Sequence, residues 1–310
     1  MTTQNSNKKI FLGCLYAIGS EIIYGVSYLF SKDITADVNP IYLEGWRFFA
    51  AFIAICICSK IGIIKLNLKG RNIKPLIIVG ILNPLLYFTG ETFGIMLTTA
   101  SEGGVALGCS PIVAVIASTL ILKKKPTKNQ LIGIFFTTIG IILTVITLKT
   151  SANFSAAGYL MLLLATISYA LYEVYVEKAA SFSSHEITFV MLASGAIVFT
   201  LISIIKASIE GNLSMLVSLP FANTKFLLVV LYQGICCSVL SLFLFNKAIT
   251  IIGANRAATF IGVETVVSIL CGVIFLKESF DTFQIIGSIL ILSGVYVANS
   301  LTSAVSSSGH

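Results

Sequence analysis

The sequence has few charged residues and almost no histidine. Of its 310 residues only 11% are Asp, Glu, Lys or Arg, whereas 56% are hydrophobic and the mean hydropathy is +0.97. Soluble domains carry roughly 25% charged residues, so this composition excludes a soluble globular protein and predicts an all-α integral membrane protein. The histidines, His185 and His310, are too few for a multi-histidine metal site.

Motifs for nucleotide binding and for proteolysis within the membrane are also missing. The sequence contains no GxxxxGK[ST], which excludes a nucleotide-driven pump built on a P-loop, and no GxGD or HExxH. The 7 cysteines fall within apolar runs without a CxxC pair and are expected to be small buried thiols. We therefore expect no enzyme activity, no cofactor and no metal. The net charge of +7 is spread over short loops, so no nucleic-acid partner is expected.

Ten apolar runs reach the length of about 20 residues that a helix needs to cross a bilayer. The loops between them are short, the longest being 207–224, and leave no room for a soluble domain. Most lysines and arginines fall on the inner side if the N-terminus lies there, which predicts that both termini are cytoplasmic and that the protein lies in the cell membrane. The predicted spans are 9–30, 39–59, 74–96, 98–122, 129–148, 156–177, 185–206, 225–248, 251–276 and 281–301.

The chain contains an internal repeat. TTASEGGVALGCSPIVAVIASTLILKK, from Thr98, aligns without a gap with IGANRAATFIGVETVVSILCGVIFLKE, from Ile252. This alignment predicts two repeats of five spans, residues 1–150 and 151–310. Because five is odd, the second repeat enters the membrane in the opposite orientation, an arrangement typical of secondary transporters whose substrate site lies between the halves. The same spacing pairs Lys123 with Lys277, Gln130 with Gln284, Gly133 with Gly287 and Gly140 with Gly294.

These segments resemble the EamA repeat of the drug/metabolite transporter superfamily. The matching features are the Ala/Gly-rich starts of the fourth and ninth spans and the Q-x-x-G…G pattern that follows each. AIGSEIIYGVSYLFSK is similar to the family's first span, with Tyr24 where tryptophan is usual, and NPIYLEGWRFFAAF to its second, Arg47 included. Thr265 departs from the family, since proline is common there. The resemblance implies a ten-helix transporter that exports small metabolites and is competent as a monomer, and it implies no particular substrate.

Carboxyl groups lie within the apolar spans. A charged side chain at the bilayer centre costs about 2.5–3.5 kcal/mol on insertion scales, so several unpaired carboxylates facing lipid would offset most of a typical stability of roughly 5–15 kcal/mol. We therefore expect these groups to face water in a cavity, to pair with cations or to keep their protons. The groups are Glu21, Glu44, Glu91, Glu173 and Glu264.

The second span contains a cation near one of these acids. Arg47 lies three residues after Glu44, so the two share a helix face. They are expected to form a structural ion pair, with recognition of a substrate carboxylate by Arg47 as the alternative.

Polar and aromatic residues also recur at helical spacing in the first and sixth spans. Such a stripe either lines a cavity or joins helices through hydrogen bonds. Asn83-Pro84 and Pro111 interrupt helices and free backbone carbonyls, which is tolerated at a cavity or where neighbouring helices satisfy them. The predicted substrate cavity comprises Glu21, Tyr24, Tyr28, Glu44, Trp46, Arg47, Asn83, Glu91, Tyr169, Tyr172 and Glu173, and the predicted proton-coupling or gating residues are Glu21, Glu264 and Pro111.

The sequence therefore predicts a secondary transporter working by alternating access. Carboxyl groups that outnumber cations favour a cationic or zwitterionic solute such as an amino acid or amine, and tyrosines and Trp46 supply aromatic contacts. Export is the expected direction, and protons are a candidate coupling partner beside the solute and the bilayer. An importer or passive exchanger is one alternative, and a non-transporting receptor or scaffold is another.

Overall fold

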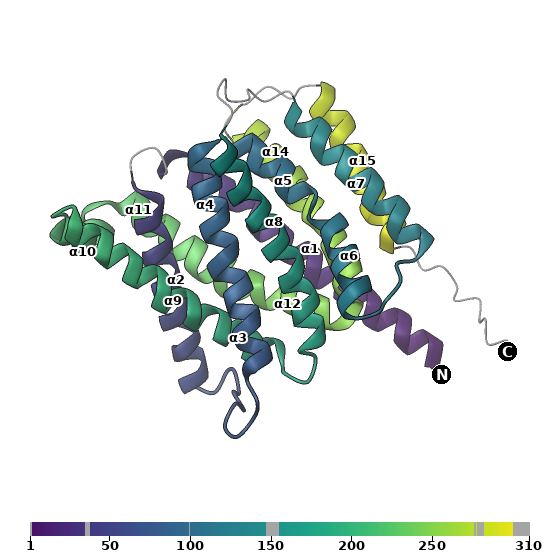
Figure 1. Cartoon of the computed structure of the whole chain (residues 1–310), viewed down its shortest axis with the longest axis horizontal. Helices are drawn as coiled ribbons and strands as arrows, with labels where there is room; N and C mark the ends of the chain where they lie inside the picture. The colour runs from purple at the N-terminus through teal and green to yellow at the C-terminus, as the bar shows by residue number, and fades with distance from the viewer. Residues whose placement is uncertain are drawn as a thin grey trace.

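The computed structural model describes residues 2–34, 38–98, 100–146, 155–275, 277 and 282–299. All regular structure in these ranges is helical, which confirms the all-α prediction. The helices form one bundle in which α7 and α15 lie side by side at one edge and α10 and α11 lie at the other (Figure 1).

The first half follows the first five predicted spans. Asn39 begins the second helix by accepting a 3.0 Å hydrogen bond from the backbone N–H of Ile41, and Pro40 occupies the first turn, where its missing N–H costs nothing. The helices are α1 (Thr2–Ile34), α2 (Pro40–Lys60), α3 (Lys74–Gly80), η1 (Ile81–Leu86), α4 (Tyr87–Leu97), α5 (Ala100–Gly108), α6 (Ser110–Ile121) and α7 (Lys128–Ile146).

The second half follows the remaining five. Ser155 caps its first helix, and Ser183 with Glu186 forms a reciprocal capping box at the start of the next. The helices are α8 (Ala156–Lys178), α9 (Ser184–Ile209), α10 (Leu213–Ala222), α11 (Thr224–Leu231), η2 (Tyr232–Ser241), α12 (Leu242–Ile252), α13 (Ala254–Ala257), η3 (Ala258–Phe260), α14 (Ile261–Phe275) and α15 (Thr282–Asn299).

Within the described ranges, 8 helices are long and apolar enough to cross a membrane, so the protein is a multi-pass membrane protein. The fourth predicted span is divided near Cys109 into α5 and α6, and the fifth corresponds to α7; both contain only shorter apolar helices. The count of ten spans stays a prediction. So does the division at residues 150 and 151, which lies outside the described residues.

One expectation was wrong. The predicted loop 207–224 contains the apolar helix α10, and α9 continues to Ile209. The indole N–H of Trp46 donates a 3.0 Å hydrogen bond to the carbonyl of Leu216, whose buried side chain packs in one cluster with Tyr42. Gly211, which suggested a loop, makes the turn before α10 at φ 71°. Pro220 lies within the helix near its end.

The glycines that mark the repeat form the contact between α7 and α15. A Cβ on Gly140 would lie 2.6 Å from the carbonyl oxygen of Gly287, and a Cβ on Gly294 would lie 2.5 Å from that of Gly133. Only glycine permits backbones to approach so closely. When each glycine is replaced by its repeat partner, the contact of Gly133 with Gly294 becomes the contact of Gly287 with Gly140. Such an exchange is what a two-fold relation between oppositely oriented halves requires.

Departures from regular helical backbone also occur at equivalent positions of the two repeats. Lys123 and Lys277, which are repeat partners, are the non-glycine residues with positive φ among those described, at 56° and 55°. The third and eighth spans are each interrupted, by η1 and η2. In η1 the backbone of Asn83 is extended, because it precedes Pro84, which lacks an N–H and disfavours the helical conformation of its predecessor. The inverted two-repeat fold thus appears in packing as well as in sequence.

Candidate functional site

A cavity of about 920 Å³ lies between the two halves. This volume is typical of a site for a small molecule. Its walls come from α1, α2, η1, α4, α5 and α7 of the first half and from α8, η2, α12, α14 and α15 of the second. The lining extends to Pro40, Met96, Val273 and Gln284, which all lie near helix ends on the predicted outer side. The cavity therefore opens toward that side.

Arg47 projects into the cavity from α2. Its Nη1 lies 3.5 Å from Oε1 of Glu44, so the expected ion pair is present, and its Nε donates a 2.9 Å hydrogen bond to the hydroxyl of Ser238 in η2. The guanidinium carbon lies 4.6 Å from the centre of the Phe88 ring. These contacts fix the guanidinium between the halves, with a cation–π contact on one side.

Two residues of the cavity lining have acceptor oxygens without partners. Oε2 of Glu44 and Oδ1 of Asn83 are buried and have no hydrogen bond. A buried acceptor left unpaired costs about 1–3 kcal/mol, so both oxygens would gain from an N–H donor, which reaches them only when the neighbouring side chains move aside. The cavity is therefore chemically suited to an amine or amide group beside Arg47.

Glu91 and Glu264 approach the cavity from α4 and α14. The hydroxyl of Tyr87 donates a 2.7 Å hydrogen bond to Oε1 of Glu91. Tyr24 and Tyr169 complete this part of the lining. The contribution of Tyr87 was missed in the sequence, although its position four residues before Glu91 places both on one helix face. Phe88 was missed as well, because nothing in its sequence surroundings distinguishes it from a core aromatic.

The predicted cavity residues thus separate into two groups. The structure places Tyr24, Glu44, Arg47, Asn83, Glu91 and Tyr169 on the cavity wall, together with Glu264 from the predicted coupling residues. The side chain of Tyr28 lies outside the described residues.

The other predicted residues lie elsewhere. Glu21 and Glu173 are buried, at 2% and 0% exposure, and neither lines the cavity. Tyr172 donates a 2.6 Å hydrogen bond to Oδ1 of Asn246 inside the bundle. Trp46 contacts α10, as described above. Pro111 is buried in the first turn of α6, where a proline fits the helix.

On the predicted inner side, polar contacts join the halves. Glu177, at the end of α8, accepts a 2.7 Å hydrogen bond from the backbone N–H of Ala254 and pairs with Lys124, which follows α6. We refer to Lys124, Glu177 and the Ala254 N–H as the inner latch. Lys124 belongs to the first half and the other two to the second, so the latch holds the halves together at the end opposite the cavity mouth.

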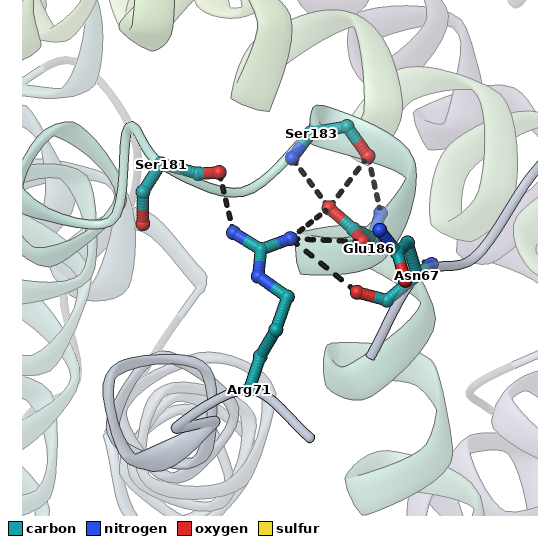
Figure 2. Close-up of polar contacts among 5 residues, drawn as sticks. All are labelled: Asn67, Arg71, Ser181, Ser183 and Glu186. Carbon is teal, nitrogen blue, oxygen red and sulfur yellow. Dashed lines mark hydrogen bonds and ion pairs between the residues drawn. The ribbon is translucent and has the colours of Figure 1, made fainter. Parts of the chain in front are cut away.

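A second contact lies at the same end (Figure 2). The guanidinium of Arg71, in the α2–α3 loop, lies 3.3 Å from Oε1 of Glu186 and donates a 2.6 Å hydrogen bond to the carbonyl of Ser181. The backbone N–H of Asn67 donates a 3.0 Å hydrogen bond to the same Glu186 oxygen. Two loops from different halves are thereby fastened to each other.

Comparison with known proteins agrees with this architecture. The model of the "EamA-like transporter family" matches residues 11–146 and again residues 156–300. The uncharacterized transporter YcxC of Bacillus subtilis (strain 168) is 28% identical over 286 residues, covering 91% of each chain. The uncharacterized transporter YyaM of the same organism is 26% identical over 293 residues, covering 91% of this chain and 92% of YyaM. A solved crystal structure shares the fold with a TM-score of 0.73 at 16% identity, over 92% of this chain and 97% of that one.

Proposed function

Because this chain belongs to the EamA-like transporter family, we propose that it is a secondary transporter that moves a small cationic or zwitterionic solute by alternating access. The observation that carries the proposal is the cavity between inverted halves, open at one end and fastened at the other. Rocking of the halves about this cavity would close the mouth and release the inner latch. We place the protein in the cell membrane as a monomer with both termini cytoplasmic.

The charge of the cavity supports the choice of solute. Glu44, Glu91 and Glu264 line it, and among the described lining residues Arg47 is their cationic counterpart. The acids exceed the cation, which favours a ligand carrying a positive group. The guanidinium of Arg47 can still receive a ligand carboxylate, and the lining carboxyl groups of Glu91 and Glu264 can receive an ammonium. An α-amino acid presents both groups, and a simple amine presents one.

The outward-facing cavity is compatible with both directions of transport under the proposed orientation. The cavity in this state faces outward, which is the state from which an exporter releases its solute and an importer collects it. We favour export, as the family resemblance implies, with import or passive exchange as measurable alternatives.

The test is counterflow in proteoliposomes. Vesicles preloaded with one unlabelled solute are diluted into the same solute at trace concentration with a radiolabel, for a panel of amino acids and biogenic amines. We expect labelled solute to accumulate transiently for at least one amine-bearing member of the panel. Glu91→Gln should reduce that accumulation at least tenfold, since it removes a lining charge while keeping the shape of the side chain.

Glu210→Gln is the matched control. Glu210 follows α9 on the predicted outer side, away from the cavity lining, and hydrogen bonds from Lys206 and Tyr42 hold the pKa of its carboxyl below the usual range. This control should transport like the unaltered protein. Accumulation of none of the panel would refute the solute class. Equal loss in Glu91→Gln and Glu210→Gln would refute the role of the cavity acid.

A further inference from the structure

Glu173 lies between the cavity and the inner latch. Tyr169, one turn earlier on α8, lines the cavity, whereas Glu173 is fully buried and does not. Glu177, one turn later on the same helix, forms the latch with Lys124 and Ala254. Successive turns of an α-helix are about 5.4 Å apart, so the Glu173 carboxyl is separated from the cavity and from the latch by about one turn each.

The Glu173 carboxyl has no partner in this state. Neither of its oxygens accepts or donates a hydrogen bond, and it forms no ion pair with any described side chain. The titratable groups that interact with it are Glu21 on α1 and Tyr169 and Tyr172 on its own helix. The ionisable described side chains on the helices packed against α8 are Lys74, Tyr87, Glu91, Lys247 and Arg256, and none of them pairs with it.

A carboxylate in this position would be an unpaired anion among apolar groups and beside a second acid. That arrangement is strongly unfavourable, whereas the protonated acid is neutral and tolerates burial. The full burial of the group, between the cavity and the latch, therefore requires that Glu173 hold a proton here.

We infer that Glu173 is an occluded proton-binding site of the transport cycle. It carries H⁺ while the cavity faces the predicted outer side and releases it to water on the predicted inner side when the latch opens. The step is Glu173–COOH giving Glu173–COO⁻ and H⁺, the proton passing to water and no other bond changing. Glu21 interacts electrostatically with Glu173 and with Glu264 of the cavity wall, and we assign to it the transfer of the proton from the cavity to Glu173.

This inference rests on the proposed alternating access and deepens it. It moves the proton from the cavity-lining Glu264 to a residue that the substrate does not touch. Glu21→Gln would then slow proton arrival, whereas Glu173→Gln would remove the site.

Infrared spectroscopy of the purified protein tests the site directly, because a protonated carboxylic acid has a C=O stretch distinct from that of a carboxylate. At neutral pH, subtraction of the Glu173→Gln spectrum from that of the unaltered protein should leave a protonated carboxyl band. Glu173→Asp should retain such a band at a shifted frequency, which shows that the loss in the glutamine variant is not caused by misfolding. Subtraction of the Glu210→Gln spectrum from that of the unaltered protein should leave no protonated carboxyl band. Absence of the band from the Glu173→Gln difference spectrum overturns the inference.

Occlusion is tested by transfer into D₂O, where exchange of the acid proton for deuterium shifts the same band. In the unaltered protein the band should exchange slowly, because both paths to water are closed. Glu177→Ala removes the latch and should accelerate the exchange at least tenfold. Equal rates in the two proteins would show that Glu173 is not sealed by the latch.

These measurements need no transported solute. If the counterflow panel fails while the band is present and its exchange is latch-dependent, the proton site stands and the proposed solute class fails. If counterflow succeeds and the Glu173 band is absent, transport stands and the proton site fails.

Discussion

The buried guanidinium of Arg47 is stabilised by several contacts at once. It is buried at 5% exposure, paired with Glu44, hydrogen-bonded to Ser238 and stacked near Phe88. A guanidinium satisfies these demands together because it is planar and carries several donors in fixed directions, whereas an ammonium on a flexible chain cannot. The residue type is therefore specified by geometry as well as by charge.

We expect Arg47→Lys to weaken solute binding by roughly tenfold, since an ammonium cannot form the two parallel hydrogen bonds that a guanidinium offers a ligand carboxylate, and loss of one of them is worth about 1–2 kcal/mol. The half-saturating solute concentration in counterflow measures this change. Arg256→Lys, a substitution of the same kind outside the cavity lining, is the control. Unchanged half-saturation in Arg47→Lys would show that the guanidinium only holds the helices together.

The contact of α7 with α15 depends on glycine at particular turns. A methyl group on Gly140 would meet the backbone of α15, which cannot move aside as a side chain can. On α1, by contrast, a methyl group on Gly19 would lie 3.6 Å from a terminal carbon of Leu244, an ordinary van der Waals distance. Both glycines lie within apolar helices, but Gly140 faces the backbone of a neighbouring helix whereas Gly19 faces a side chain.

We expect Gly140→Ala to destabilise the protein by about 1–3 kcal/mol through overpacking. Gly19→Ala should be neutral or stabilising, because alanine favours a helix over glycine by up to ~1 kcal/mol. Unfolding in detergent, followed by circular dichroism against denaturant, compares the two. A larger loss in Gly19→Ala than in Gly140→Ala would contradict the packing described here.

Charged contacts hold the two halves together at the inner end, whereas at the outer end a cavity lies between them beside the hydrogen bond of Tyr42 with Glu210. This asymmetry defines the outward-facing state of the whole transporter. Because the two repeats are inverted, an exchange of their arrangements would give a state open at the other end. The inner latch contains a hydrogen bond from Ala254 to a carboxylate, a class worth ~1.5–3 kcal/mol, and an exposed ion pair worth ~0–1 kcal/mol. Loss of the latch should therefore raise the population of molecules open on the inner side by on the order of tenfold or more.

Hydrogen–deuterium exchange of the backbone measures this population. In Glu177→Ala we expect faster exchange of amides in α13 and at the end of α6, with exchange at the start of α2 slowed or unchanged. Glu210→Ala, on the predicted outer side, should not alter exchange in α13. Uniformly faster exchange over the chain would indicate general destabilisation instead of latch opening.

Much of the fold was predictable because its signals are local. Apolar runs located the helices, and the matched spacing of Gly133, Gly140, Gly287 and Gly294 indicated the repeat before any contact was known. The 207–224 segment was misjudged because Gly211 and Pro220 are turn residues in most settings, whereas here they flank and end a short helix packed under Trp46. The ion pair of Glu44 with Arg47 was predictable, since both members lie on one helix.

The composition and periodicity of the chain were sufficient to require a helical membrane protein with a polar interior, because burial of charge in lipid is too unfavourable to leave its acids exposed. They did not determine which acids meet the cavity. Glu91 and Glu173 have similar apolar surroundings in the sequence, yet one lines the cavity and the other is sealed beneath it. Helical spacing relates a side chain only to its own helix, whereas depth and access depend on how each helix is rotated and tilted against the others, and that is set by packing across the whole bundle.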